Sequence, residues 1–128
     1  MPAPRGQNPA IVYEALSESN RPLTAYQILE LVKDRGLKGP PTIYRALEML
    51  KADGLVHRVE SINAFVASNH DRRGQPDPSF MICKSCGVAA EFHDKRLGRL
   101  LSEWKNRARF SVSRQTVELV GTCQACQG

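Results

Sequence analysis

All four cysteines of the 128-residue chain lie in two Cys-x-x-Cys pairs. The first pair is Cys83 and Cys86, the second is Cys123 and Cys126, and 36 residues separate the two pairs. Two such pairs can place four thiolates tetrahedrally around one zinc ion at about 2.3 Å. A site that is closed by four protein ligands is structural rather than catalytic. We therefore predict a structural zinc site, in preference to disulfides or free thiols.

Three histidines could bind a second metal ion. His57, His70 and His93 all fall in the middle of the chain, and Glu91 lies two residues before His93. Side chains two residues apart on a strand point to the same face. A set of nitrogen ligands with one carboxylate suits zinc, iron(II) or nickel, so the ligand types alone do not choose the metal.

Three helices are predicted in the part of the sequence that precedes His57. Asn8 is expected to cap the first helix, with Pro9 at its first position. Thr24 and Gln27 have the spacing in which the cap and the third residue of a helix bond each other's amides, and Pro40 opens the third helix. Apolar residues then recur at spacings of three and four. The residues expected to face inward are Ile11, Val12, Ala15 and Leu16 in the first helix, Ile28, Leu31 and Val32 in the second, and Ile43, Leu47 and Leu50 in the third.

Two short strands are predicted after the helices. Residues 55–59 and 64–67 have strand composition, and a turn at residues 61–63 joins them. Three helices followed by a hairpin, with a short gap between the second and third helices, are typical of a winged helix-turn-helix. An unrelated small α+β domain is the alternative that this pattern leaves open. Arg45 is expected to point outward from the third helix.

The second half of the chain has a different pattern. Residues 68–79 are rich in Asp, Arg, Gly and Pro, and we expect a linker or hinge there. Residues 80–83, 88–92 and 114–120 are predicted strands, and residues 95–107 are a predicted amphipathic helix. The residues of this helix expected to face inward are Leu97, Leu100, Leu101 and Trp104.

Composition indicates an ordinary globular protein, with 41% apolar and 24% charged residues. No apolar stretch approaches the roughly 18 residues that span a bilayer, and residues 1–7 lack the apolar core of a secretory signal. We therefore expect a cytoplasmic protein without a membrane partner, a setting that argues against disulfides. The net charge of +5 suits nucleic acid, but residues 1–67 carry eight Lys and Arg against seven Asp and Glu, so any DNA-binding charge must be local.

Four motifs together resemble the ferric uptake regulator family over nearly the whole chain. The motifs are Gly39 to Leu47 (GPPTIYRAL), Gly54 to Glu60 (GLVHRVE), Phe80 to Gly87 (FMICKSCG) and Gly121 to Cys126 (GTCQAC). The sequence is most similar to the zinc uptake regulator branch, because it combines His57-Arg-Val-Glu-Ser61 and Asn63-Ala-Phe65 with a complete four-cysteine set.

The resemblance implies a fold and a function. The expected fold class is α+β, with an N-terminal winged helix-turn-helix domain at residues 1–67, a hinge at 68–79, and a small α/β dimerisation domain with the four-cysteine zinc site at 80–128. The expected function is that of a zinc-responsive repressor. Such a protein is not an enzyme and takes no small-molecule substrate. The resemblance implies a homodimer that binds a pseudo-palindromic operator near metal-uptake genes when its sensory site is loaded, with metal as the corepressor.

For DNA contacts, the resemblance carries over Tyr26 on the second helix and Thr42, Tyr44 and Arg45 on the third. Arg45 is the most informative of these residues. An exposed arginine on a recognition helix can bond the O6 and N7 atoms of guanine bidentately, and such a pair discriminates by about 1 to 3 kcal/mol. Tyr44 flanks the inward residues, and such a tyrosine is more often a partly buried packing residue than a base contact.

For the sensory metal, the resemblance implies His57 and Glu91 as ligands. Ser68 stands where family members have a cysteine ligand, and residues 75–79 replace the usual histidine-rich run. The first coordination shell therefore departs from the family pattern. The remaining candidate ligands are His70, His93, Asp71 and Asp77.

Three other functions are weighed against this one. A zinc-dependent enzyme would need an open coordination position with a general base beside it, and the four-cysteine set offers none. A zinc-ribbon adaptor for protein partners would not need the apparent recognition helix. An iron- or peroxide-responsive regulator of the same family is disfavoured by the scarcity of hinge histidines.

Overall fold

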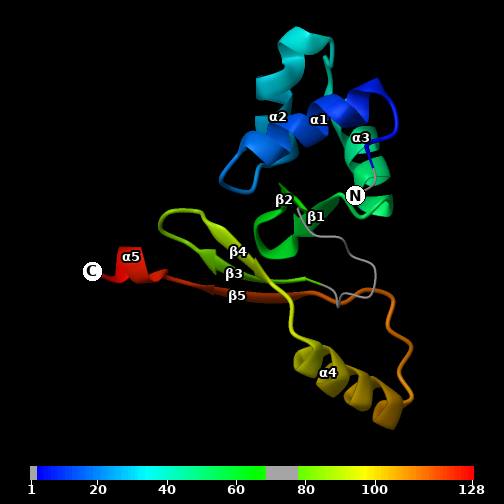
Figure 1. Ribbon diagram of the computed structural model, residues 1–128, viewed down its shortest axis with the longest axis vertical. Coiled ribbons are helices and arrows are strands. Elements are labelled where there is room, and N and C mark those ends of the chain that lie inside the picture. Colours follow the sequence, from blue (N-terminus) through cyan, green and yellow to red (C-terminus); the bar gives the residue numbers. More distant parts are fainter. Residues whose placement is uncertain (1–2, 69–77) are drawn as a thin grey trace. The chain divides into compact units, whose positions relative to one another are not determined.

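The computed structural model describes residues 3–68 and 78–128. The chain divides into two compact units, residues 1–70 and 71–128 (Figure 1). Residues 69–77, which make up most of the predicted hinge, lie outside the described residues. No helix of the described part is long and apolar enough to cross a membrane.

The first helix, α1 (Gln7–Glu18), begins earlier than predicted. Its N-cap is Gly6, whose φ of 92° lies in the region that favours glycine, so the predicted cap Asn8 lies inside the first turn. Pro9 is tolerated there because the first amides of a helix have no intrahelical partner. Ile11, Val12 and Leu16 are buried as predicted.

The second helix, α2 (Ala25–Val32), begins at the predicted capping box. The Gln27 N–H donates to Thr24 Oγ1 at 3.2 Å, and the Thr24 N–H donates to Gln27 Oε1 at 2.8 Å. Its buried residues are Ala25, Ile28 and Val32, and the prediction that Leu31 faces inward is wrong, because Leu31 is 60% exposed. A 3-10 turn, η1 (Lys33–Arg35), follows and ends at Gly36, whose φ is 98°.

The third helix, α3 (Pro40–Ala52), has two prolines in its first turn. The predicted inward residues Ile43, Leu47 and Leu50 are each at most 1% exposed, and Ala46 joins them. These four side chains pack with those of α1 and α2 in the core of the first unit. Because one face of α3 is fixed in the core, its opposite face must point away from it.

A two-stranded hairpin completes the first unit. Strands β1 (Val56–Val59) and β2 (Ala64–Ala67) are antiparallel, with His57 opposite Val66, and the 3-10 turn η2 (Glu60–Ile62) connects them. Asn63 adopts a φ of 49° at the end of this turn. Three helices followed by a hairpin confirm the predicted winged helix-turn-helix arrangement.

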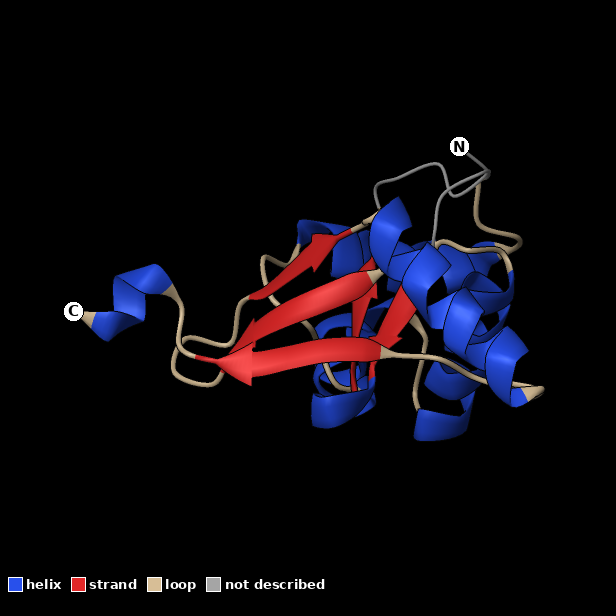
Figure 2. Cartoon of the chain, turned by 90° about the horizontal axis from the view of Figure 1, so that it is seen from below, coloured by secondary structure: helices blue, strands red, loops and turns tan. Residues whose placement is uncertain are grey.

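The described part of the second unit contains a three-stranded sheet and two helices. Figure 2 shows its strands in red and its helices in blue. The middle strand β3 (Ser79–Cys83) is antiparallel to β4 (Ala89–Phe92) and parallel to β5 (Val117–Gly121). The four-residue helix α5 (Gln124–Gln127), which was not predicted, follows β5. The predicted α/β character of this unit is thus confirmed.

Helix α4 (Lys95–Ala108) lies where an amphipathic helix is predicted. The Asp94 carboxylate caps it by accepting from the Arg96 N–H at 2.8 Å. The prediction that Leu100 and Trp104 face inward is wrong for the single chain, because these side chains are 51% and 58% exposed. Leu97 and Leu101 are partly buried. Half of the apolar face of α4 is therefore left uncovered.

Candidate metal centre and DNA-binding helix

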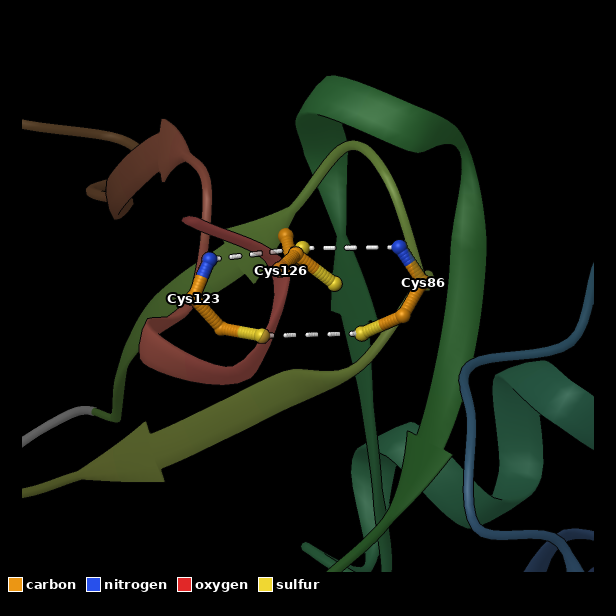
Figure 3. Close-up of side chains that lie close together, drawn as sticks. Cys86, Cys123 and Cys126 are labelled. Carbon is orange, nitrogen blue, oxygen red and sulfur yellow. Dashed lines mark hydrogen bonds between the residues drawn. The ribbon is translucent and has the colours of Figure 1, made fainter. Parts of the chain in front are cut away.

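The four cysteines come together at one end of the three-stranded sheet. Cys83 is the last residue of β3, Cys86 lies in the turn that follows, and Cys123 and Cys126 lie at the start and within α5. Their sulfur atoms all lie within 4.8 Å of one another. Figure 3 shows the side chains of Cys86, Cys123 and Cys126 converging, with the Cys86 and Cys123 Sγ atoms 3.9 Å apart.

Local backbone hydrogen bonds hold both cysteine turns. The Cys83 N–H donates to the Val88 carbonyl at 2.9 Å, and the Gly87 N–H donates to the Cys83 carbonyl at 2.9 Å. Gly87 adopts a φ of 80°, which glycine tolerates and which closes the first turn tightly. The Cys126 N–H donates to the Cys123 carbonyl at 3.0 Å in the second turn. These bonds hold the two cysteines of each pair close together in one tight turn.

The geometry fits a tetrahedral metal ion. Four sulfur ligands at about 2.3 Å from one zinc ion stand about 3.8 Å apart, which is close to the separation of the Cys86 and Cys123 sulfurs. All four positions around such an ion would be taken by protein sulfur. No position would remain for a water molecule that could attack a substrate.

The thiols of this cluster differ in acidity. The backbone N–H groups of Cys123 and Cys86 each donate to Cys83 Sγ at 3.4 Å, and they lower the pKa of Cys83 to about 5. The Cys83 thiolate is thus stabilised by the fold itself. Side-chain hydrogen bonds that the Cys126 thiol donates to the sulfurs of Cys123 and Cys83 raise the pKa of Cys126 to about 12. A metal ion must therefore displace a proton from Cys126 at neutral pH.

Glu91 and His93 form a second pair of possible metal ligands in the second unit. Glu91 lies on β4 and His93 follows that strand, and Glu91 Oε2 is 2.6 Å from His93 Nε2. Their side chains are only 14% and 13% exposed. The two-residue spacing places them on one face, as predicted. They offer one carboxylate and one imidazole to an ion.

The other predicted sensory ligands belong to the first unit or lie outside the described residues. His57 on β1 is 7% exposed. Ser68 lies two residues beyond Val66, the strand partner of His57, and is 1% exposed. The Ser68 N–H donates to the Leu55 carbonyl at 2.8 Å. His70, Asp71 and Asp77 are not among the described residues. The prediction that His57 and Glu91 bind one ion stays a prediction.

The four predicted DNA-binding residues all lie in the helix-turn-helix. Tyr26 in the first turn of α2 is 66% exposed, and Tyr44 on α3 is 43% exposed. Tyr44 is thus more accessible than a packing residue would be. Thr42 is partly exposed and Arg45 is exposed. The buried face of α3 directs Arg45 away from the core.

Arg45 is held by a hydroxyl rather than by a carboxylate. Its Nη2 atom donates to Thr42 Oγ1 at 3.5 Å. The neighbouring carboxylate of Glu48 is paired with Lys51 Nζ at 3.5 Å instead. Among the described residues of the first unit, no acid forms an ion pair with Arg45. Its guanidinium can therefore bind an external acceptor without first breaking a salt bridge.

Sequence comparison identifies related proteins. The family model described as "Ferric uptake regulator family" matches residues 8–120. The chain is 28% identical over 116 residues to the zinc uptake regulation protein of Escherichia coli (strain K12), which covers 90% of this chain and 68% of that protein. It is 27% identical over 105 residues to the zinc uptake regulation protein of Mycobacterium tuberculosis (strain ATCC 25618 / H37Rv), covering 81% of this chain and 79% of that protein.

Two solved structures resemble the chain along most of its length. The crystal structure of holo XcZur has a TM-score of 0.85 and 36% identity, and the match covers 95% of this chain and 85% of that one. A zinc uptake regulator complexed with zinc and DNA has a TM-score of 0.86 and 28% identity, and the match covers 95% of this chain and 82% of that one.

Proposed function

Because the chain belongs to the zinc uptake regulator branch of the ferric uptake regulator family, we propose that it is a zinc-responsive transcriptional repressor. It binds double-stranded operator DNA as a homodimer when its sensory site is loaded, and it thereby controls genes of metal uptake. Members of this family are transcription regulators rather than enzymes. The observation that carries the proposal is that Arg45 on α3 is exposed and forms no ion pair with an acid among the described residues of the first unit. The same chain brings four cysteine thiols together.

The proposed DNA contacts use the outward side of the helix-turn-helix. The major groove is about 12 Å wide and admits an α-helix. We place α3 in this groove, with Arg45 bonded to guanine and with Thr42 and Tyr44 beside it. Tyr26, at the exposed start of α2, is placed near the DNA backbone. A related regulator was solved in a complex with zinc and DNA, which supports DNA binding by this chain.

The four cysteines are assigned to a structural zinc ion. Zinc bound by Cys83, Cys86, Cys123 and Cys126 would join β3 to the end of the chain, because the two pairs flank β4, α4 and β5. The sheet of the second unit is small, and few of its side chains are buried. Metal-binding free energy in such a unit is folding free energy.

A second zinc ion is assigned to the sensory site. His57 from the first unit and Glu91 from the second are its proposed ligands, with His93 beside Glu91 and with His70 as a further candidate. Ligands from both units can bind one ion only when the units adopt one arrangement. Zinc then selects the spacing of the two recognition helices in the dimer, and operator half-sites demand a fixed spacing of about 34 Å.

The homodimer would cover the apolar side chains that the second unit leaves exposed. Besides Leu100 and Trp104, three more large apolar residues of this unit are more than half exposed. They are Phe110 at 69%, Leu119 at 57% and Val120 at 56%. A second copy of the chain supplies an equivalent apolar surface, as two-fold symmetric interfaces require. We also propose that the protein acts in the cytoplasm, because its proposed partner is operator DNA.

The proposal is tested by measuring operator affinity against metal. Fluorescence anisotropy of labelled operator fragments is recorded in buffers that fix free zinc, iron(II) or manganese. We expect tight binding to an operator, but not to random DNA, when zinc is present. A response to iron(II) alone would instead identify an iron-responsive member of the family. Equal binding with and without metal would overturn metal control.

A further inference from the structure

Glu48 shares the outward ridge of α3 with Arg45. The inward face is fixed by Ile43, Ala46, Leu47 and Leu50, all at most 2% exposed. At 3.6 residues per turn, Arg45 and Glu48 lie on the side of the helix opposite these residues. The Glu48 side chain is 72% exposed. A recognition helix that presents Arg45 to DNA therefore presents Glu48 as well.

The two side chains are spaced like neighbouring base pairs. Residues three apart on a helix are separated by a rise of about 4.5 Å. Base pairs along a duplex are separated by about 3.4 Å. Side chains of this length can cover the difference, so Arg45 and Glu48 can reach adjacent base pairs.

A carboxylate on this ridge has few acceptable partners in DNA. Phosphates repel it, and so do the acceptor atoms O6 and N7 of guanine and O4 of thymine. The exocyclic amino group of cytosine is a donor that Glu accepts from. Adenine also carries an amino group, but its bidentate partner is Asn or Gln. Cytosine is thus the base that suits Glu48 best.

The present partner of Glu48 does not compete strongly with a base. Lys51 Nζ is 3.5 Å from Glu48 Oε1, in a pair three residues apart on an exposed helix face. Such exposed pairs contribute little to stability. Lys51 offsets the charge of Glu48 while the helix approaches DNA, and the carboxylate can leave it at low cost.

We propose that Glu48 is a specificity-determining residue that accepts a hydrogen bond from the amino group of a cytosine, next to the guanine bound by Arg45. This inference rests on the proposed function, since it needs α3 in the major groove. Arg45 selects its base by attraction. Glu48 selects cytosine by attraction and rejects guanine and thymine by repulsion, which is a common means of specificity.

The chain offers a closely matched control for Glu48. Glu30 on α2 is 71% exposed and is paired with Lys33, also three residues away, at 3.0 Å. Removing either carboxylate changes the net charge equally and breaks an equivalent ion pair. Glu30→Gln therefore reports the general electrostatic gain of losing one acid near DNA, and any further change in Glu48 variants reports base selection.

The experiment compares wild type, Glu48→Gln, Glu48→Ala and Glu30→Gln on operator duplexes in which each base pair of a half-site is changed in turn. We expect wild type to prefer cytosine at one position by about 5- to 150-fold. Glu48→Gln should move that preference to adenine, and Glu48→Ala should abolish it. Glu30→Gln should strengthen binding to all duplexes by one factor and keep the cytosine preference. Zinc content and circular dichroism check that each variant folds.

The result that overturns the proposal is a uniform gain. If both Glu48 variants bind every duplex more tightly by one factor, as Glu30→Gln does, Glu48 is a solvated acid that contacts no base. Zinc-dependent operator binding by wild type would then still support the proposed function. A wild-type protein that ignores zinc and sequence would overturn both.

Discussion

Arg45 differs in its surroundings from three other arginines of the first unit. Arg5, Arg35 and Arg58 each form an ion pair with an acid, at 2.7, 3.2 and 3.1 Å. Arg45 instead donates to the Thr42 hydroxyl, at 3.5 Å. A guanidinium held by a long, neutral hydrogen bond is oriented but not neutralised. It therefore keeps its full charge for a base or a phosphate.

Replacement of Arg45 by alanine should weaken operator binding by about 1 to 3 kcal/mol, because a bidentate contact to guanine is lost. The Arg45 side chain does not pack in the core, so zinc content and dimerisation should be unchanged. Anisotropy titrations on operator and random duplexes measure the effect. An equal loss on both duplexes would mean that Arg45 contacts a phosphate instead of a base.

Replacement of Cys83 by serine should remove the structural zinc and unfold the second unit. The Cys83 thiolate receives two backbone hydrogen bonds, and a serine hydroxyl cannot replace it as a soft zinc ligand. Metal analysis and circular dichroism check this outcome. Wild-type zinc content and helicity in Cys83→Ser would show that the cluster is not a structural site.

The cysteine cluster could be predicted from the sequence because its spacing is a local property of each pair. The buried residues of a helix were harder to predict where two different faces of that helix both fit its apolar pattern. Leu31 fits a helical period with Ile28 as Ala25 does, but the buried face of α2 passes through Ala25, Ile28 and Val32. Which face is buried depends on where α1 and α3 pack against α2, and the pattern within α2 does not give this.

At the scale of elements, the start of α2 depends on one reciprocal pair of hydrogen bonds. Thr24→Ala should remove the bond from the Gln27 N–H and destabilise the first unit by about 1 kcal/mol. Thr24→Ser keeps a hydroxyl and should cost much less. Chemical denaturation measures both variants. Equal stability of wild type and Thr24→Ala would show that the cap contributes nothing.

Helix α4 shows what a single sequence cannot reveal about an apolar face. The amphipathic pattern predicts that Leu100 and Trp104 are covered, but it does not say by which chain. In the single chain these side chains are exposed, and Arg107 lies over the Trp104 ring at 4.8 Å from its centroid. The proposed cover by a second copy would reconcile the pattern with the structure.

Trp104→Glu should shift the chain from dimer to monomer, because burial of such a large apolar side chain contributes about 1.5 to 3 kcal/mol. Sedimentation velocity measures the change. Leu31→Glu is the matched control, since Leu31 is 60% exposed but lies on α2, and this variant should stay dimeric. A dimer of unchanged stability in Trp104→Glu would place the interface elsewhere.

At the scale of the whole molecule, the two units could be anticipated because each has its own pattern. Three capped helices and a hairpin precede a segment rich in Asp, Arg, Gly and Pro, and the cysteines all follow it. The sensory site could not be derived in the same way. Its proposed ligands are far apart in the sequence, and Ser68 takes the place of an expected thiol, so no local spacing defines the set.

Zinc control of DNA binding should disappear when either proposed sensory ligand is removed. His57→Ala and Glu91→Ala should each retain the structural zinc and remain dimeric, because neither residue belongs to the cysteine cluster. Each should bind operator equally with and without added zinc. A wild-type zinc response in either variant would transfer its role to His70, His93, Asp71 or Asp77.

The most direct test of metal control is the zinc affinity of the sensory site with and without operator DNA. Linkage requires that DNA tighten zinc binding by the same factor by which zinc tightens DNA binding. We expect a competition titration with a zinc chelator to give a sensory-site affinity about 5- to 150-fold higher in the presence of operator, the usual range for such coupling. Random DNA should have a much smaller effect. A zinc affinity that operator DNA leaves unchanged would contradict zinc control of DNA binding.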